Sequence, residues 1–334
     1  MKAQVCSRIG PIESGVMSYE SVPDPKFEPN KVLIRIKACG VCHSNLSMIE
    51  GEFQIFGVPS KLPIIPGHEI TGVIEKVGKD TKGVREGQRV GVQVLYDSCG
   101  KCDYCLTGNE NLCLTKNATG ETVDGGYAEY IAAPYDYIYE LPDNVGYEEG
   151  APLFCPGVTA YRAVRRAGIK PGQSVAVIGI GGVGHMSLQF AKLAGAETIA
   201  IDKSEGQLKL AEELGADHVL LSEDVKDYIS KKEKVDVAMV HAPSQKAVDQ
   251  ALSIVKHGGV VLMGVLGNVN VVFPEEISIV SSVIGSRHEM REVLKIASMG
   301  KVKVKWTAYK LREANNVLKK LKQGQIVGRA VLVP

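Results

Sequence analysis

The sequence predicts an α/β protein of two domains, one β-rich and the other a doubly wound parallel sheet. Three observations support this prediction. The 334 residues exceed the size, about 250–300 residues, at which a single hydrophobic core stops growing. Residues 1 to about 150 have the pattern of short strands between turns, and residues 155 to 290 alternate between strands and helices. A glycine-rich motif lies at the first strand–helix junction of the second region.

The first region carries the residue pattern of half-buried strands. Polar and apolar residues alternate in Val32–Lys37, which is the period of a strand with one buried face. Gly72–Val77 and Arg89–Val94 are also rich in β-formers, with glycine or proline near their ends. The amino terminus lacks the apolar core of a signal peptide, and we expect it to form the first strand of this domain.

The second region is expected to alternate strands with helices, which implies a parallel sheet covered on both faces. The predicted strands are Ser174–Gly179, Thr198–Asp202, Val235–Val240 and Gly259–Gly264. The predicted helices are Val183–Ala194, Glu205–Leu214 and one near Gln245–Ile254. Beyond this region we expect helices near Arg291–Ser298 and Leu311–Leu321, the latter followed by Gly324 as a cap, and a final strand, Ala330–Leu332.

Composition and charge exclude several classes of function. The chain is 45% hydrophobic and 23% charged, with a formal net charge of +1. This balance gives no electrostatic reason to expect nucleic acid or an anionic membrane as a partner. The most apolar stretches, such as Gly258 to Gly267, are shorter than the about 18–20 residues that a membrane span needs. We therefore expect a cytoplasmic protein, in which the eight cysteines are reduced and suggest metal ligands before disulfides.

The glycine motif predicts a dinucleotide site. It consists of Gly179, Gly181, Gly182, Val183 and Gly184, with an isoleucine after the first glycine. The motif follows an apolar strand and opens a helix, as a dinucleotide fingerprint must. The first glycine allows a tight turn, the second lets the backbone approach a pyrophosphate, and the last lets helix and strand pack closely. The helix amino terminus then directs partial positive charge toward the phosphates.

Asp202 is the predicted selector of the cofactor. It ends the second strand of the region, about twenty residues after the motif, where a carboxylate can accept hydrogen bonds from the adenosine ribose. The same charge repels a 2′-phosphate, so NAD is favoured over NADP. Lys203, beside the acid, weakens this preference because a cation there tolerates some phosphate. The alternative is a glycine-rich turn with a capping aspartate. It does not explain why the strand, the turn, the helix and the acid all occur in the order and at the spacing of a dinucleotide fingerprint.

A loop with four cysteines predicts a structural zinc site. Cys99, Cys102, Cys105 and Cys113 follow one another closely enough to close a tetrahedron of thiolates around one Zn²⁺. The loop is polar and glycine-containing, so metal binding would order it. Free cysteines and disulfides are poorer explanations in a reducing compartment. An iron–sulfur cluster is the better alternative, although the C-x3-C-P ending of ferredoxins is missing.

A second set of candidate ligands is dispersed along the chain. Cys42, His68 with Glu69, and Cys155 offer two thiolates and one imidazole, which leaves a fourth position for water or substrate, as at a catalytic zinc. The residues alone do not establish that these side chains meet. A structural histidine in the Pro-Gly-His turn and an ordinary buried cysteine at 155 are the alternatives.

The chain resembles the zinc-containing medium-chain alcohol dehydrogenases over essentially its whole length. The segments that carry the resemblance occur in the family's order: Ala38-Cys-Gly-Val-Cys-His-Ser-Asn45, Pro66-Gly-His-Glu69, the four-cysteine loop, Asp124-Gly-Gly-Tyr-Ala-Glu129, Cys155-Pro-Gly-Val-Thr-Ala-Tyr161 and the glycine motif. The resemblance implies a GroES-like catalytic domain, residues 1–152 completed by residues 288–334. It also implies an inserted Rossmann domain for NAD, residues 153–287.

The resemblance implies roles for individual residues of the catalytic domain. Cys42, His68 and Cys155 match the ligands of the catalytic zinc. Glu69 matches a carboxylate near the metal that can ligate it transiently. Ser44 matches the hydroxyl that hydrogen-bonds the bound alcohol. Together with the four-cysteine loop, this implies one catalytic and one structural zinc per chain.

Further residues match positions near the cofactor. His43 matches a polar or cationic residue near the pyrophosphate, Thr159 a position beside the nicotinamide, and Arg329 an arginine that reaches the phosphates. Cys39 matches no functional position, and a redox role for Cys39-x-x-Cys42 is a weak alternative.

The sequence departs from the family at three positions. Asn45 stands where the family usually has an aspartate that holds a ligand histidine, and an amide raises imidazole basicity less than a carboxylate. Ser47 stands where many members have a proton-relay histidine, and Gln207 where many NAD users have a lysine or arginine. These departures affect the expected proton path and substrate more than the reaction.

The implied reaction is the reversible oxidation of primary or secondary alcohols to aldehydes or ketones with NAD. A polyol, amino-alcohol or cinnamyl alcohol dehydrogenase is the alternative within the family, and zinc-free quinone reductases are disfavoured because every zinc ligand is present. A catalytically silent NAD-binding protein would not need Ser44, and a zinc-ribbon nucleic-acid binder lacks a basic or aromatic face. Relatives of this type form homodimers or homotetramers, and we expect one of these states.

Overall fold

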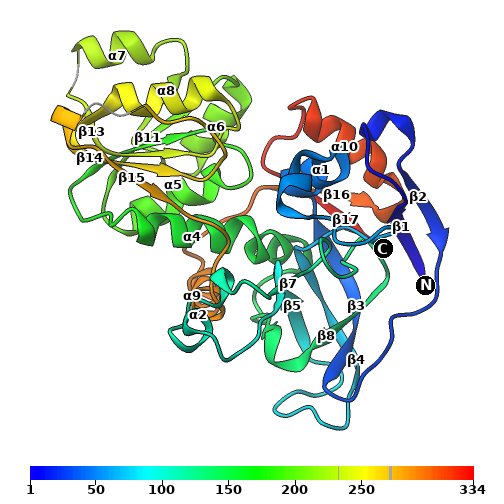
Figure 1. Ribbon diagram of the computed structural model, residues 1–334. Helices are drawn as coiled ribbons and strands as arrows, with labels where there is room; N and C mark the ends of the chain where they lie inside the picture. Colours follow the sequence, from blue (N-terminus) through cyan, green and yellow to red (C-terminus); the bar gives the residue numbers. More distant parts are fainter. Residues whose placement is uncertain (232, 271–272) are drawn as a thin grey trace. The chain divides into compact units, whose positions relative to one another are not determined.

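The computed structural model describes residues 1–231, 233–270 and 273–334, and the chain divides into two compact units (Figure 1). The first unit comprises Met1–Cys155, Ile284–Met299 and Val304–Pro334, and the second comprises Pro156–Val283 and Gly300–Lys303. Both ends of the chain therefore contribute to the first unit. No helix in the described ranges is long and apolar enough to cross a membrane.

The first unit is β-rich. Its strands are β1 (Lys2–Cys6), β2 (Met17–Ser21), β3 (Lys31–Gly40), β4 (Ile70–Val77), β5 (Arg89–Val92), β6 (Leu95–Asp97), β7 (Asn117–Ala118), β8 (Tyr130–Pro134), β9 (Ile138–Glu140), β16 (Trp306–Lys310) and β17 (Arg329–Val333). The main sheet has the order β16-β17-β3-β4-β5-β9, with β8 paired to β3. Strands β1 and β2 form an antiparallel ribbon, and β6 pairs with β7. The pairing of β17 with β3 joins the carboxyl-terminal strand to the amino-terminal part of the sheet.

Short helices complete the first unit. They are α1 (His43–Glu50), α2 (Asp103–Leu106), α3 (Tyr147–Gly150), α9 (Arg287–Ser298) and α10 (Ala314–Lys322). Alternate residues of β3, among them Val32, Ile34 and Ile36, are fully or almost fully buried, as the polar–apolar alternation of this segment predicts. These side chains belong to one hydrophobic core that also includes residues of β1, α1 and α10.

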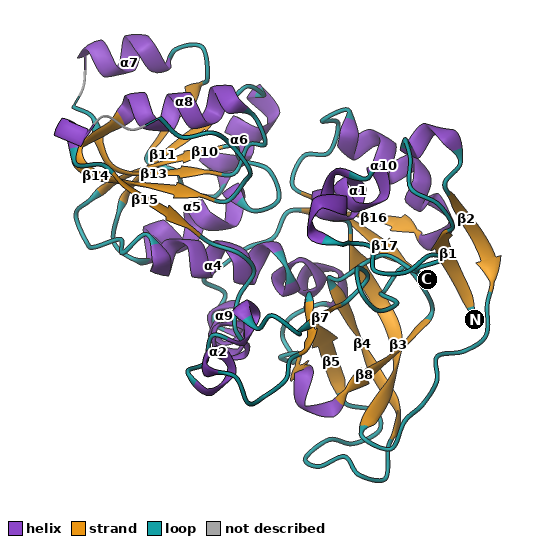
Figure 2. Ribbon diagram, viewed as in Figure 1, coloured by secondary structure: helices purple, strands orange, loops and turns teal. Residues whose placement is uncertain are grey.

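The second unit is a parallel sheet with helices on both faces. Its strands are β10 (Ser174–Ile178), β11 (Glu197–Asp202), β12 (His218–Leu221), β13 (Val235–Val240), β14 (Val255–Met263) and β15 (Ser278–Ser281), in the order β12-β11-β10-β13-β14-β15. Its helices are α4 (Pro156–Arg166), α5 (Gly184–Leu193), α6 (Glu205–Glu213), α7 (Val225–Lys231) and α8 (Gln245–Ile254). Figure 2 shows α5 and α8 on opposite faces of this sheet. The predicted fold class, a β-rich domain with a doubly wound parallel sheet, is confirmed.

Helix α9 begins four residues before its predicted start at Arg291. Ser286 accepts a hydrogen bond from the backbone N–H of Glu289, and the Glu289 carboxylate accepts one from the backbone N–H of Ser286. This capping box satisfies two N–H groups that would otherwise have no partner at the start of the helix. The S-x-x-E pattern at residues 286–289 is visible in the sequence and would have corrected the prediction.

Candidate active site

Four residues from three separate parts of the chain meet in the first unit, at the ends of secondary-structure elements. Cys42 directly precedes α1, His68 and Glu69 directly precede β4, and Cys155 follows a 3-10 turn, Ala151–Phe154. One ligand atom of each residue lies within 4.8 Å of the corresponding atom of every other. The structure thus brings together the dispersed ligands that the sequence predicts.

The donor set of this cluster fits a zinc ion. The Sγ atoms of Cys42 and Cys155 are 3.8 Å apart, and both cysteines are free. Two sulfurs that each lie about 2.3 Å from one tetrahedral ion are separated by about 3.8 Å, so the spacing matches a shared Zn²⁺. In addition, Oε2 of Glu69 is buried and has no hydrogen-bond partner in the described part of the chain. A buried carboxylate oxygen of this kind needs a compensating group, and a cation provides one.

A buried ion pair fixes Glu69 in the cluster. Its Oε1 accepts a hydrogen bond at 2.5 Å from Nη2 of Arg329, which also donates to the carbonyl of Val41 at 2.8 Å. Both side chains are 5% exposed or less. Gly40 makes room for the carboxylate, since a Cβ there would lie 1.9 Å from Oε2 of Glu69. Burial raises the pKa of Glu69 to about 7, although the charge of Arg329 acts in the opposite direction.

The hydroxyl of Ser44 lies beside two of the ligand atoms. Its Oγ donates a hydrogen bond to Sγ of Cys42 at 3.1 Å and is 3.4 Å from Nε2 of His68. Ser44 is the second residue of α1, so the backbone of the helix determines its position relative to Cys42. One turn later, Ser47 is buried, and its Oγ is 3.5 Å from Nδ1 of the exposed His43.

The two ring nitrogens of His68 face different surroundings. Nε2 faces the hydroxyl of Ser44, whereas Nδ1 is 3.3 Å from Nδ2 of Asn45 and 3.6 Å from Oε1 of Glu121. Oδ1 of Asn45 in turn accepts a hydrogen bond from the hydroxyl of Tyr127 at 3.2 Å. Glu121 was not among the residues predicted from the sequence, because it lies in a loop and belongs to no motif.

Contacts among Cys42, Cys155 and His68 shift the pKa values of these side chains. The pKa of Cys42 is held well below its usual value, first by a hydrogen bond with Cys155 and then by His68, against the effect of burial. Burial by itself would lower the pKa of His68, but its hydrogen bond with Cys42 and the negative charge of that thiolate raise it to about 9. The arrangement therefore favours a thiolate at Cys42, which is the form that ligates metals.

Apolar side chains line the cluster on one side. Val94 and Ala118 pack against Cys155, together with the partly buried Cys42 and Ile284. The backbone of Ile284 has a φ of 38°, a left-handed conformation that β-branched residues rarely adopt. The two cysteines thus have apolar neighbours on this side, whereas Ser44, His68 and Glu69 provide the polar groups of the cluster.

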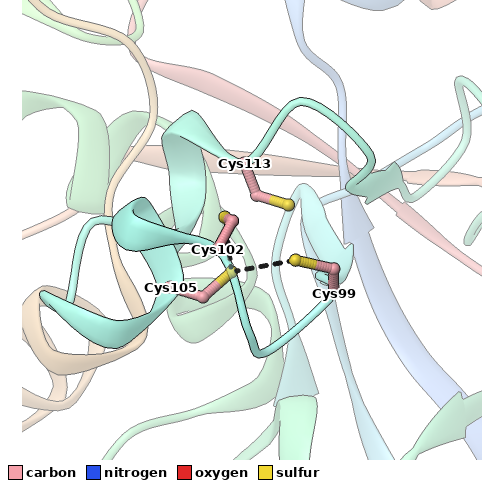
Figure 3. Close-up of side chains that lie close together, drawn as sticks. All are labelled: Cys99, Cys102, Cys105 and Cys113. Atoms are coloured by element: carbon pink, nitrogen blue, oxygen red, sulfur yellow. Dashed lines mark hydrogen bonds between the residues drawn. The ribbon is translucent and has the colours of Figure 1, made fainter.

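The second metal-ligand cluster lies in the loop around α2. The sulfurs of Cys99, Cys102, Cys105 and Cys113 all point toward one centre (Figure 3) and lie within 4.8 Å of one another. The sulfur of Cys105 is 3.9 Å from that of Cys99 and 3.5 Å from that of Cys102. A hydrogen bond from the backbone of Cys99 is the largest cause that lowers the pKa of Cys113, to about 6. Four sulfurs around one centre fit a closed, structural zinc site.

The glycine motif of the second unit has the geometry that a dinucleotide requires. Gly179 has a φ of 92°, a conformation that favours glycine. A Cβ at Gly184 would lie 1.8 Å from the carbonyl oxygen of Gly179, so only glycine lets α5 approach β10 this closely. A Cβ at Gly181, by contrast, would meet nothing within 4 Å. Gly182 and Val183 are half-buried beside it, so the open space at this turn fits a pyrophosphate.

Asp202 ends β11 and holds the glycine loop. Its Oδ2 accepts a hydrogen bond from the backbone N–H of Ile180 at 2.7 Å, and its Oδ1 accepts one from that of Ser204 at 2.9 Å. The carboxylate is half-exposed and retains lone pairs for a ribose hydroxyl. The neighbouring Lys203 is exposed.

Three other residues named in the sequence prediction are placed as follows. Thr159 is half-buried in α4, and Gln207 is 9% exposed in the first turns of α6. Arg329 begins β17, where its guanidinium contacts Glu69 and Val41 of its own unit. Its predicted contact with cofactor phosphates stays a prediction.

Comparisons with known proteins identify the family. Residues 28–143 match the model of the alcohol dehydrogenase GroES-like domain, and residues 182–299 match that of zinc-binding dehydrogenases. An alcohol dehydrogenase of Geobacillus stearothermophilus is 41% identical over 325 residues, which cover 95% of this chain and 96% of the relative. The chain belongs to the zinc-containing medium-chain alcohol dehydrogenase family. This family membership confirms the resemblance predicted from the motifs.

Other relatives and solved structures of alcohol dehydrogenases agree with this assignment. The family member of Moraxella sp. strain TAE123 is 37% identical, with 99% of both chains covered. The crystal structure of the alcohol dehydrogenase of Aeropyrum pernix has a TM-score of 0.92 with 33% identity, and each chain is covered completely. A structure described as an NAD-dependent alcohol dehydrogenase has a TM-score of 0.91 with 27% identity, again with complete coverage of both chains.

Proposed function

We propose that this family member is an NAD-dependent alcohol dehydrogenase with one catalytic and one structural zinc per chain. Cys42, His68 and Cys155 would hold the catalytic zinc, with Glu69 as a nearby alternative ligand. The observation that carries this proposal is the convergence of these four side chains, with ligand atoms within 4.8 Å of one another. The four-cysteine loop would hold the structural zinc. When bound, Zn²⁺ would supply a Lewis acid that lowers the pKa of an alcohol hydroxyl, and NAD would accept the hydride.

Ser44 would move the proton of the alcohol. Its hydroxyl lies 3.1 Å from Sγ of Cys42 and 3.4 Å from Nε2 of His68, so Oγ is adjacent to the atoms that would surround the substrate oxygen. Because Ser47 replaces the relay histidine, the proton must leave Oγ by another route, such as a ribose hydroxyl and water. Arg329 would hold the carboxylate of Glu69 in place, since its Nη2 donates both to that side chain and to Val41.

Ser44→Ala is expected to lower kcat by about 10²–10⁴-fold, the range that proton transfer by a positioned group contributes. Zinc content should stay at the parental value, because Ser44 is not a ligand. The measurement is single-turnover NADH formation with an alcohol, which avoids a limit set by cofactor release. Ser44→Thr, which keeps a hydroxyl, should retain much of the activity. Ser47→Ala, a control in the same helix, should be close to the parent. Parental turnover in Ser44→Ala would remove Ser44 from the proton path.

The substrate class we propose is apolar primary or secondary alcohols. Support comes from the packing of Val94, Ala118 and Ile284 around the two cysteines of the cluster. Such side chains cannot satisfy the additional hydroxyls of a polyol, whose desolvation would then oppose binding. A structure described as a cinnamyl alcohol dehydrogenase from Sorghum bicolor is 26% identical to this chain. We therefore include aromatic alcohols in the proposed substrate class.

The glycine motif with Asp202 supports NAD as the cofactor. The hydrogen bonds of Asp202 to Ile180 and Ser204 keep its carboxylate beside the glycine loop, where a 2′-phosphate would be repelled. We propose NAD on this basis. The structures in the comparison include both an acetophenone reductase of Geotrichum candidum in complex with NAD and a dehydrogenase of Sinorhizobium meliloti bound to NADP.

Asp202→Gly is expected to shift the ratio of kcat/KM for NADP to that for NAD upward by at least about tenfold, which corresponds to about 1.4 kcal/mol. Some loss of thermal stability should accompany it, because Ile180 and Ser204 lose their acceptor. Asp217→Asn is the control, since Asp217 also accepts from a backbone N–H, that of Thr198, without contacting the glycine loop. An unchanged ratio in Asp202→Gly would show that another residue selects the cofactor.

We further propose that the protein is cytoplasmic and forms a homodimer or homotetramer. We also propose a catalytic domain of residues 1–152 and 288–334 and an NAD-binding domain of residues 153–287. The compact units support this division except at residues 153–155, 284–287 and 300–303, which they assign to the opposite unit. In the described residues, β15 pairs with β14 on one side only and forms an edge of its sheet. An exposed edge strand is a ready surface for pairing with another chain.

A further inference from the structure

As a metal ligand, His68 needs an acceptor for the proton on its second ring nitrogen. A neutral imidazole that ligates a metal through Nε2 carries its proton on Nδ1. In metal sites this Nδ1–H is donated to a carboxylate or carbonyl, which fixes the tautomer and the orientation of the ring. Among the residues that the structure describes, two side chains reach Nδ1 of His68, namely Asn45 at 3.3 Å and Glu121 at 3.6 Å.

In its observed orientation, the side chain of Asn45 cannot accept the Nδ1 proton of His68. Its Oδ1 accepts the hydroxyl proton of Tyr127, which leaves Nδ2, a donor, facing Nδ1 of His68. Rotating the amide would turn Oδ1 toward His68 but would leave the hydroxyl proton of Tyr127 without an acceptor. Tyr127 is 0% exposed, and in the described part of the chain Asn45 is the one hydrogen-bond partner of its hydroxyl. Because buried donors without partners are costly, the observed orientation of Asn45 is favoured.

Glu121 has the properties of the missing acceptor. Its side chain is 15% exposed, and within the described residues His68 is its ion-pair partner, with Oε1 3.6 Å from Nδ1. This distance exceeds a normal N–H···O hydrogen bond, about 2.7–3.2 Å, by a few tenths of an ångström. A cation bound at Nε2 makes the Nδ1 proton a stronger donor and draws the carboxylate closer.

The loop that carries Glu121 is fixed against the turn that carries His68. The backbone N–H of Gly126 donates to the carbonyl of Gly67, the residue before His68, at 2.8 Å. A Cβ at Gly120 would lie 2.7 Å from the backbone nitrogen of Gly67, so the two segments are in direct contact. Glu121 therefore approaches His68 from a backbone that is itself held in place, which a positioning residue requires.

We propose that Glu121 is the positioning residue of His68, whose carboxylate accepts the Nδ1 proton and so presents Nε2 to the metal. The proposal rests on the proposed function, in which His68 is a zinc ligand. It accounts for the departure at Asn45: an aspartate at that position accepts from both Tyr127 and His68, whereas the asparagine accepts from Tyr127 alone. Glu121 provides the second acceptor from a different segment of the chain.

The first experiment measures the zinc affinity of this site by competition with a chelator, and the visible spectrum of Co²⁺ bound in place of zinc. Glu121→Ser, which removes the acceptor, is expected to lower the affinity about 10–100-fold, as loss of such a partner typically does, and to shift the Co²⁺ bands. Glu121→Gln keeps a neutral carbonyl acceptor and should lower the affinity less; it is measured alongside, so that a folding defect in one variant leaves the other to decide. If His68→Ala weakens zinc binding and neither Glu121 variant does, the inference is overturned. If His68→Ala also leaves the affinity unchanged, the proposed function fails instead.

The second experiment is a rescue. Adding Asn45→Asp to Glu121→Ser places a carboxylate between Tyr127 and His68, and we expect it to restore most of the zinc affinity and the parental Co²⁺ spectrum. Failure to restore them would show that Glu121 acts other than as an acceptor for His68 and would overturn the inference. Asp124→Asn, a control in the same loop, removes contacts with Lys61 and the backbone of Ile65 and should leave zinc affinity unchanged.

Discussion

Cys155→Ala should remove one of two zincs per chain and lower alcohol turnover by at least about 10³-fold. Metal catalysis of this kind supplies several kcal/mol of transition-state stabilisation, and each 1.36 kcal/mol is a factor of ten in rate. The sulfur of Cys155 lies 3.8 Å from that of Cys42, so Cys155→Ala removes one of the ligands of the proposed catalytic zinc. NADH binding should persist, because the glycine motif belongs to the other compact unit. Metal analysis, NADH titration and single-turnover kinetics provide the test.

Cys6→Ala is the matched control for this variant. Cys6 is also a free and buried cysteine of the first unit, but its sulfur contacts the carbonyl of Arg8 and belongs to neither ligand cluster. Its replacement creates a cavity of similar size and should leave both zincs and turnover in place. Two zincs and normal turnover in Cys155→Ala would contradict the assignment of the catalytic site.

Cys102→Ala should act on stability. Its loop has little hydrophobic burial of its own, since Leu106 and Leu114 are 71% and 89% exposed. The order of the loop therefore depends on the metal, whose binding free energy contributes directly to folding. We expect the loss of one zinc and a fall in Tm of at least about 5 °C, the shift produced by a loss of roughly 3–4 kcal/mol in a chain of this length.

The catalytic cluster should survive this substitution. Below the melting transition, Cys102→Ala should retain the second zinc and the turnover of each folded molecule, because none of the four loop cysteines belongs to the other cluster. Thermal melting and metal analysis, with Cys6→Ala as the reference, check this result. A parental Tm together with full zinc content would contradict the structural role of the loop.

The fold was predictable where the hydrophobic pattern and the glycine signals agree. The predicted spans Val235–Val240 and Gln245–Ile254 coincide with β13 and α8, because β-branched residues and an amphipathic period identify them. The start of β14 was predicted at Gly259, four residues late. Lys256, His257 and Gly258 interrupt the apolar pattern there, and the register against β13 shifts between Val235 and Val237. Irregular pairing of this kind depends on the neighbouring strand and leaves no local pattern.

The site was predictable only in part, for a similar reason. Cysteine and histidine spacing identifies the ligands, since few other functions need these residue types in these motifs. The partners of the ligands depend on which loops come together in space. Asn45 could be recognised as a departure, but its orientation is set by Tyr127, 82 residues away along the chain. Glu121 has no sequence signal at all, because its approach to His68 results from the packing of one loop against another.

Zinc removal and reconstitution test whether the metal at the dispersed site is catalytic. Zinc is withdrawn from the accessible site with a chelator, the remaining metal is counted, and NADH formation from a small apolar alcohol is measured before and after one equivalent of Zn²⁺ is returned. We expect turnover to disappear with the first zinc lost, while the four-cysteine loop keeps its metal, and we expect the returned equivalent of Zn²⁺ to restore turnover. Unchanged turnover in protein that has lost this zinc would contradict a catalytic metal at Cys42, His68 and Cys155.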